Sequence, residues 1–145
     1  MPYKNIEIEP VEKPYLQPVK KDHFYKGFSS VNPLNSGGRL YDFELVKQDI
    51  VNHFNTKKGE RLMNPAFGSI IWDLLMEPLT EQTREALNQD ITEICNSDPR
   101  VYPTDITLTE YENGYILDVT LVLKNTDQSG NMRIAFDQKL GLLVQ

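Results

Sequence analysis

The chain has 145 residues, of which 39% are hydrophobic and 25% charged, and its formal net charge is -6. This size suits one compact domain with a hydrophobic core. Because neither a standard secretion signal nor an apolar run of about 18 residues occurs, we expect a protein that is neither secreted by that route nor membrane-spanning. The negative charge argues against nucleic-acid binding, which needs a basic face to displace the counterions of phosphate groups.

The first 22 residues are rich in proline and carry charges of both signs. Proline fixes the backbone angle φ and removes an N–H donor, so this segment is predicted to form an extended arm and not a strand or helix of the core. Such an arm is either loose or laid on a neighbouring molecule. The prolines lie at positions 2, 10, 14 and 18.

A connector joins this arm to the predicted domain. Aromatic side chains gathered in residues 23–30 predict a short strand on the domain edge. Residues 32–38 contain an Asn-Pro pair and a Gly-Gly pair, which predict a loop. We therefore divide the chain into residues 1–37, the N-terminal arm and connector, and residues 38–145, the folded domain.

A first long helix is predicted to begin at Asp42, which can cap it. Gly59 is expected to end the helix in a left-handed conformation, just after two lysines that suit its negative end. His53 falls outside the apolar stripe, so we expect a surface or edge residue and not a metal ligand. The stripe has the spacing of one helical face and consists of Phe43, Val46, Ile50, Val51 and Phe54.

The segment that follows is predicted to be the centre of the core. Residues 64–68 predict a turn, after which Ser69 can cap a short helix. Six of the seven residues from 70 to 76 are large and apolar, which predicts burial on nearly all sides. Pro78 ends the helix, because proline disfavours a helical conformation at the preceding residue.

A second long helix is predicted over Glu81–Asn96, with Thr80 as its cap. The whole net charge lies in and around this helix, because Asp73–Asp98 holds seven acids and one base, which gives -6, and the rest of the chain sums to zero. Cys95, the single cysteine, cannot form an internal disulfide and fits a reducing compartment such as a bacterial cytoplasm. The apolar face of the helix carries Leu87, Ile91, Ile94 and Cys95.

After this helix the hydrophobic period changes to two. Residues 106–108 predict one strand, Asn113-Gly114 predicts a hairpin turn, and residues 132–136 predict a further strand. The long strand between them alternates at Tyr115, Leu117, Val119, Leu121 and Leu123. Helices followed by an antiparallel β-meander predict an α+β fold.

The motifs of common enzymes and metal sites are missing from the sequence. We find no glycine-rich phosphate loop, no Cys/His cluster with metal spacing and no Gly-x-Ser-x-Gly elbow, so we predict no catalytic, cofactor-binding or metal-binding residue. Paired carboxylates remain the alternative, because two of them about 5 to 10 Å apart suffice for glycoside hydrolysis. Glu77 with Glu60 or Asp73 is the candidate pair.

Two charged motifs flank the central segment. Glu60 and Arg61 follow a glycine turn, and Glu77 precedes Pro78 where the helix must break. A charge at such a junction is normally paired, because desolvation of an unpaired charge is costly. Either Arg61 bridges internally to Glu77 or Asp73, or Glu77 meets an arginine or a helix end on a partner.

The order and spacing of four segments resemble the gene-25-like baseplate wedge family of contractile-tailed phages. They are residues 45–56, Lys58-Gly59-Glu60-Arg61, residues 64–68 and Glu77-Pro78, and the resemblance spans roughly residues 38–136. In the related type VI secretion protein TssE an arginine follows the Glu-Pro pair. This chain has Leu79 there, so the role of that arginine is not carried over.

The resemblance implies a structural wedge protein of the tail baseplate, with no enzyme activity and no cofactor. It would be assembled in the host cytoplasm, with several copies in a six-fold baseplate. The coiled-coil core bundle of the wedge would contact Glu77, Pro78, Arg61 and Glu60. The fold would be similar to the interlocking domain of the sheath subunit, so arms of the tail sheath protein could add strands to the sheet. This would link the bundle to the first sheath ring and start sheath polymerisation.

A small sheet also predicts strand addition on physical grounds, because its unpaired edges are templates for another strand. Ile116 and Val122 place apolar side chains on the second face of the long strand, so a partner strand or a cover is expected there. The residues expected to meet a sheath strand are Tyr115, Leu117, Val119 and Leu121. Members of the family have also been labelled lysozyme-like, and peptidoglycan hydrolysis in the baseplate is the alternative function.

Overall fold

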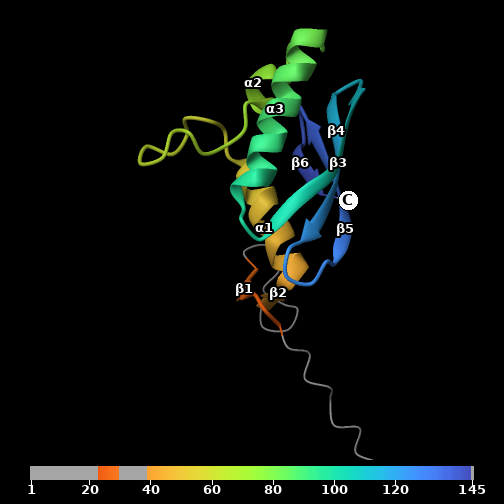
Figure 1. Cartoon of the computed structure of the whole chain (residues 1–145). Helices are drawn as coiled ribbons and strands as arrows, with labels where there is room; N and C mark the ends of the chain where they lie inside the picture. The colour runs from red at the N-terminus through yellow and green to blue at the C-terminus, as the bar shows by residue number, and fades with distance from the viewer. Residues whose placement is uncertain (1–22, 30–38, 145) are drawn as a thin grey trace, which may run out of the picture.

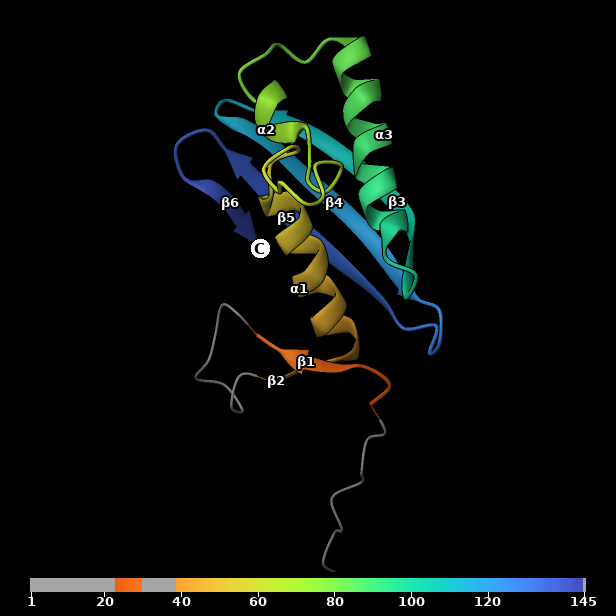
Figure 2. The ribbon, with the colours of Figure 1, turned by 90° about the vertical axis from the view of Figure 1, so that its left-hand side faces the viewer.

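The computed structural model describes residues 23–29 and 39–144, so the arm (residues 1–22) and the predicted loop (residues 32–38) lie outside the described residues. Helices cover one face of a four-stranded sheet, and a two-stranded sheet lies at the start of the first helix (Figure 1, Figure 2). The elements are β1 (Lys26–Phe28), β2 (Arg39–Tyr41), α1 (Asp42–Asn55), α2 (Ile71–Leu74), α3 (Glu81–Ser97), β3 (Val101–Tyr111), β4 (Gly114–Leu123), β5 (Ser129–Asp137) and β6 (Gly141–Val144). The predicted α+β fold is confirmed.

The large sheet is an antiparallel meander in the order β3-β4-β5-β6. The predicted hairpin is confirmed, but its turn is shifted by one residue. Tyr111 pairs with Gly114, so Glu112 and Asn113 form the turn and Gly114 begins β4. A side chain on Gly114 would overlap the carbonyl of Phe136 in β5, so glycine at this position allows the two strands to approach.

The fourth strand, β6, was not predicted. It has only four residues and pairs with the end of β5, from Asp137↔Gly141 to Ile134↔Val144. Gly141 has a φ of 79°, which fits the left-handed residue at the end of a short hairpin loop. A strand this short gives no readable two-residue period, so its pairing with β5 is known only from the tertiary structure.

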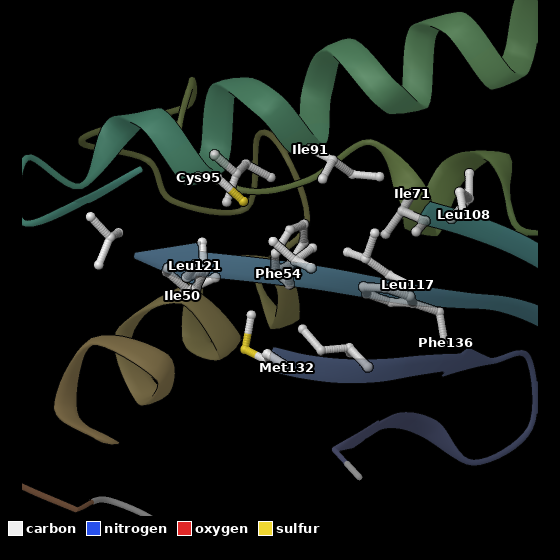
Figure 3. Packing of buried hydrophobic residues seen from close by; sticks show 14 of the residues in the cluster. Ile50, Phe54, Ile71, Ile91, Cys95, Leu108, Leu117, Leu121, Met132 and Phe136 are labelled. Atoms are coloured by element: carbon white, nitrogen blue, oxygen red, sulfur yellow. The ribbon is translucent and has the colours of Figure 1, made fainter. Parts of the chain in front are cut away.

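The core lies between the helices and the inner face of the sheet (Figure 3). Strand β4 alternates almost perfectly between buried and half-buried residues, because every second side chain of a strand points to the same face. The fully buried large side chains include Val46 and Phe54 of α1, Leu87 and Ile91 of α3, Tyr115, Leu117 and Leu121 of β4, and Met132, Ile134 and Phe136 of β5.

Helix α3 matches its prediction closely. Thr80 caps it by accepting a hydrogen bond from the Thr83 N–H at 3.3 Å, and its predicted apolar face is buried. Cys95 on that face is fully buried, which raises the pKa of its thiol to about 12. None of the helices in the described part of the chain is long and apolar enough to cross a membrane.

The predicted cap of α1 is wrong. The Asp42 carboxylate does not cap the helix but accepts hydrogen bonds from the N–H groups of Phe24 and Tyr25, both at 2.9 Å, and lies 2.8 Å from His23 Nδ1. Although burial raises the pKa of Asp42, these hydrogen bonds outweigh it and hold the pKa below its usual value. Asp42 therefore fastens the segment before β1 to the domain.

The end of α1 also differs from the prediction. The helix stops at Asn55, and Thr56 is extended. Gly59 is left-handed, with a φ of 88°, but it belongs to the following loop, where its N–H donates to the Pro65 carbonyl at 2.9 Å. The two lysines before it pair with side chains on other elements, which favours the loop over another turn of helix.

The central segment is not the centre of the core, so that prediction is wrong as well. Helix α2 is a single turn, and only Ile71 and Leu75 of residues 70–76 are buried, while Met76 is 79% exposed. The segment covers one end of the sheet, so one side of it faces solvent. Ser69 stands one residue before Ile70, the N-cap position of α2, but its hydroxyl accepts a hydrogen bond from the N–H of Ile71 in the first turn and donates one to Asp90.

Candidate functional site

The corner formed by Glu77 and Pro78 is held rigidly while its side chains face solvent. The Tyr115 hydroxyl, which reaches out from the core, lies 3.3 Å from the carbonyl oxygens of both Leu74 and Glu77 and can donate to either. Gln138 also donates to the Leu75 carbonyl at 2.8 Å. The backbone of the corner is therefore fixed to the sheet, and the Glu77 carboxylate is left exposed.

Burial raises the pKa of Tyr115, and the charges of two nearby carboxylates, Glu110 and Glu77, raise it further. The same two glutamates line a hollow beside the corner, together with Glu112 and Met76. Glu60 and Asp73, the candidate partners of Glu77 in the alternative hydrolase function, do not line this hollow. The acidic surface at the corner thus combines residues from the α2–α3 connection and from the β3–β4 hairpin.

The internal ion pair that the sequence left open does not form. Within the described residues, no salt bridge joins Arg61 or Glu77 to another side chain. Asp73 pairs instead with Lys57, with 2.6 Å between Nζ and Oδ1, and Glu60 accepts a hydrogen bond from the Lys57 N–H. The Arg61 guanidinium lies over the Phe67 ring at 3.9 Å from its centroid.

A buried carboxylate, Asp90 of α3, fixes the loop that precedes the corner. It is 4% exposed and accepts hydrogen bonds from the Ser69 hydroxyl at 2.7 Å and the Ile70 N–H at 3.1 Å. Lys58 Nζ lies 3.3 Å from its other oxygen. Asp90 was not predicted from the sequence, although its position three residues after Leu87 and one before Ile91 places it on the apolar face.

His53 contacts the same loop by stacking on Phe67, with ring centroids 3.9 Å apart. Burial lowers the pKa of His53, the Asp90 charge opposes this effect, and the net pKa is below the usual value. His53 is thus a packing residue at the base of the loop. Among the described residues, no group of three or more His, Cys, Asp or Glu side chains is placed to hold a metal ion.

The prediction that β4 receives a partner strand is wrong. Strand β4 pairs with β3 on one side and with β5 on the other, so neither of its backbone edges is open. The four residues predicted to meet that strand point into the core and are at most 1% exposed; they are Tyr115, Leu117, Val119 and Leu121. A strand can join this sheet only beside β3 or β6.

The two outer strands differ in how well they could accept another strand. Strand β3 contains Pro103 and a bulge before Asp105, and the Leu108 carbonyl accepts a hydrogen bond from Arg84 of α3 at 3.3 Å. Strand β6 has no proline and no charge, and in the described residues only β5 pairs with it. Proline, bulges and charges are the usual protections of a strand edge, so β6 is the less protected edge.

A rigid, exposed Glu-Pro corner and an unprotected strand edge on a small α+β domain define a class of protein that builds assemblies through its surface. The family model described as baseplate wedge protein gp25 matches residues 42–128. The chain therefore belongs to the baseplate wedge protein gp25 family, which confirms the resemblance found in the sequence. It is a structural component of a phage tail baseplate and assembles with other baseplate proteins.

Among solved structures, the chain is similar to a protein from Geobacter sulfurreducens that is provisionally described as a tail lysozyme. The TM-score is 0.58 and the sequences are 23% identical, over 66% of this chain and 90% of that one. At this identity the likeness shows a shared fold and carries no information about activity. A comparison with curated proteins gave no match.

Proposed function

We propose that this wedge protein links the core bundle of the baseplate wedge to the first ring of the tail sheath and starts sheath polymerisation by accepting a sheath strand beside β6. The observation that carries the proposal is the open, uncharged edge of β6 in a sheet whose other edge is protected. Main-chain hydrogen bonds supply affinity in strand addition, and side-chain pockets supply specificity. A six-fold baseplate with several copies of the chain would present several such edges to one sheath ring.

The side chains around β6 indicate what the added strand must look like. On the outer face, Ile116, Ala135 and Leu143 are cross-strand neighbours, and Leu143 at the end of this row is 40% exposed. Val144, next to Ile134 on the helix side, is 51% exposed. A strand beside β6 would cover both side chains, so we expect it to carry apolar residues on both of its faces.

We assign the opposite contact, with the coiled-coil core bundle, to Glu77, Pro78, Arg61 and Glu60. Support comes from the exposed Glu77 carboxylate, which has no internal ion pair within the described residues, and from the hydrogen bonds that hold the corner. A preorganised carboxylate loses little conformational freedom when it binds an arginine or a helix N-terminus.

Replacing Glu77 with alanine tests this contact. We expect binding of the full chain to wedges that lack it to weaken about 30-fold, because truncating one partner of an interfacial charge pair costs on the order of 2 kcal/mol or more. The free energy of unfolding should change by less than about 1 kcal/mol, because the side chain is exposed. A variant that binds normally, or that loses several kcal/mol of stability, would place Glu77 in the fold and not in an interface.

The N-terminal arm, residues 1–22, would add a further attachment to a neighbouring subunit. Deleting residues 1–20 should leave the melting temperature of the domain unchanged, because this proline-rich segment is expected to form an extended arm outside the core. Retention in isolated baseplates should fall about tenfold, since a tethered second contact raises the effective affinity. Quantitative blotting of purified baseplates measures this, and unaltered retention would show that the arm is dispensable.

The alternative function, peptidoglycan hydrolysis, has one observation in its favour, because Glu77, Glu110 and Glu112 share a hollow. All three carboxylates are exposed, whereas a general acid of a glycosidase normally needs an apolar environment that raises its pKa. We therefore propose that the chain is not an enzyme. Turnover of peptidoglycan in a zymogram, abolished by Glu77→Gln, would establish the hydrolase instead.

A further inference from the structure

The 57–69 loop, which runs from Lys57 to Ser69, projects from the body of the domain beside α2 (Figure 1). Its tip is a turn in which the Asn64 N–H donates to the Arg61 carbonyl at 3.2 Å, so Leu62 and Met63 occupy the two central positions. Such positions usually hold Gly, Pro, Asn, Asp or Ser. Here they hold two large apolar side chains that are 94% and 98% exposed.

The loop that carries this tip is built as a rigid support. Its two ends are joined by hydrogen bonds between Lys58 and Ser69 and between Ser69 and Thr56, at 3.2 and 2.9 Å, and Gly59 donates to Pro65 across the middle. Asp90 binds the base of the loop from inside the domain. Rigid presentation lowers the entropic cost of binding, so this construction suits a contact surface.

The charges around the tip restrict the partner. The basic residues at the base are already engaged, since Lys57 pairs with Asp73 and Lys58 with Asp90. Arg61 is stacked on Phe67 and has no carboxylate partner in the part of the chain that the structure describes. An apolar centre beside an unpaired guanidinium is complementary to an apolar socket with a carboxylate at its rim.

We propose that Leu62 and Met63 form an apolar plug that enters such a socket on the core bundle of the baseplate wedge, with Arg61 paired to an acidic residue at the rim of the socket. The proposal deepens the proposed function and rests on it, because the plug lies on the loop that holds Glu60 and Arg61. The salt bridge from Lys57 to Asp73 ties the base of this loop to α2, whose end leads into Glu77. The plug and the Glu77-Pro78 corner would thus contact the core bundle at two points.

The test measures binding of the full-length chain to wedges purified from tails that lack it. The double substitution Leu62→Ser with Met63→Ser should raise the apparent Kd about 100-fold, because apolar residues at the centre of an interface dominate affinity. Phe28→Ser is the matched control, since Phe28 is also a large apolar residue, 78% exposed, but lies on β1. It should bind within about twofold of the wild type. Thermal melting should be unchanged in both variants.

The outcomes separate this inference from the function on which it rests. If the double variant binds as tightly as the wild type while Glu77→Ala binds weakly, the plug is wrong and the docking function stands. If neither variant affects binding, both fail. If the wild type floats with phosphatidylglycerol vesicles, the double variant does not, and wedge binding is unaltered, the tip serves a membrane surface and the socket is excluded.

Discussion

Phage that carry the substitutions Leu143→Lys and Val144→Lys should assemble far fewer sheathed tails than the wild type. Both residues lie on β6, are 40% and 51% exposed and sit on opposite faces of the strand. Lysines on an edge strand oppose the pairing of another strand, because each added chain would have to bury a charge. We expect sheathed tails, counted by electron microscopy, to fall at least about tenfold, which corresponds to on the order of 1.4 kcal/mol or more.

The matched control places the same charges on the other edge. Thr107 and Thr109 of β3 are exposed, and Thr107→Lys with Thr109→Lys should leave sheath formation intact, because this edge is already protected. Both double variants should melt close to the wild type, since surface substitutions typically change stability by less than about 0.5 kcal/mol each. Normal sheaths on the β6 variant, or loss of sheath with the β3 variant, would contradict the choice of edge.

Asp90→Ala should destabilise the domain strongly, because it removes the acceptor at the centre of a buried polar network. The substitution leaves the Ser69 hydroxyl and the Ile70 N–H without their acceptor and Lys58 without its partner. Removing one member of a buried charged network typically costs about 3 to 5 kcal/mol, and urea unfolding of the full chain measures the loss. Because Lys58 is partly exposed, most of this cost is assigned to the two buried donors.

Glu93→Ala is the control for this variant, because Glu93 lies on the same helix but is exposed and, among the residues the structure describes, hydrogen-bonds to Gln89 alone. It should shift the free energy of unfolding by less than about 0.5 kcal/mol. A loss below about 1 kcal/mol for Asp90→Ala would show that the loop is held mainly by backbone hydrogen bonds and stacking. In that case the rigid support proposed for the tip at Leu62 and Met63 would depend less on Asp90.

The parts of the fold that could be predicted are those specified by local patterns. Helix α3 was predictable from its 3.6-residue hydrophobic period and its Thr80 cap, and β4 from its alternating side chains. Each of these elements buries one face, so its hydrophobic residues recur with the period of its secondary structure. The Asn113-Gly114 pair predicted the hairpin with an error of one residue. Its exact position depends on the close approach of Gly114 to β5, which is a contact between residues far apart in sequence.

Long-range contacts explain most of the wrong predictions. Asp42 is a residue type that commonly caps a helix, but its carboxylate accepts hydrogen bonds from the N–H groups of residues 24 and 25 instead. Residues 70–76 are apolar enough to be buried, yet α2 covers only the end of the sheet and leaves Met76 outside. The alternating residues of β4 were expected to meet a partner strand, but they lie on the face of the sheet that the helices cover and are therefore buried.

The candidate site was predictable in part. The sequence placed Glu77 before Pro78, where a helix breaks, and left its ion-pair partner open, and the structure shows an exposed side chain on a fixed backbone. The choice between an internal bridge and a free charge depended on contacts between distant residues, because Asp73 pairs with Lys57 and Arg61 lies over Phe67. Because the sequence did not predict β6, it could not indicate that the unprotected edge of the sheet lies on this strand.

A density map of the assembled tail at side-chain resolution is the decisive measurement for strand addition beside β6. We expect a strand of the sheath protein to pair with the backbone of Gly141–Val144 and to cover Leu143, while Glu77 contacts the core bundle on the other side. A map in which β6 faces solvent, or pairs only with residues of its own chain, and in which Glu77 meets only water would contradict the proposed linkage.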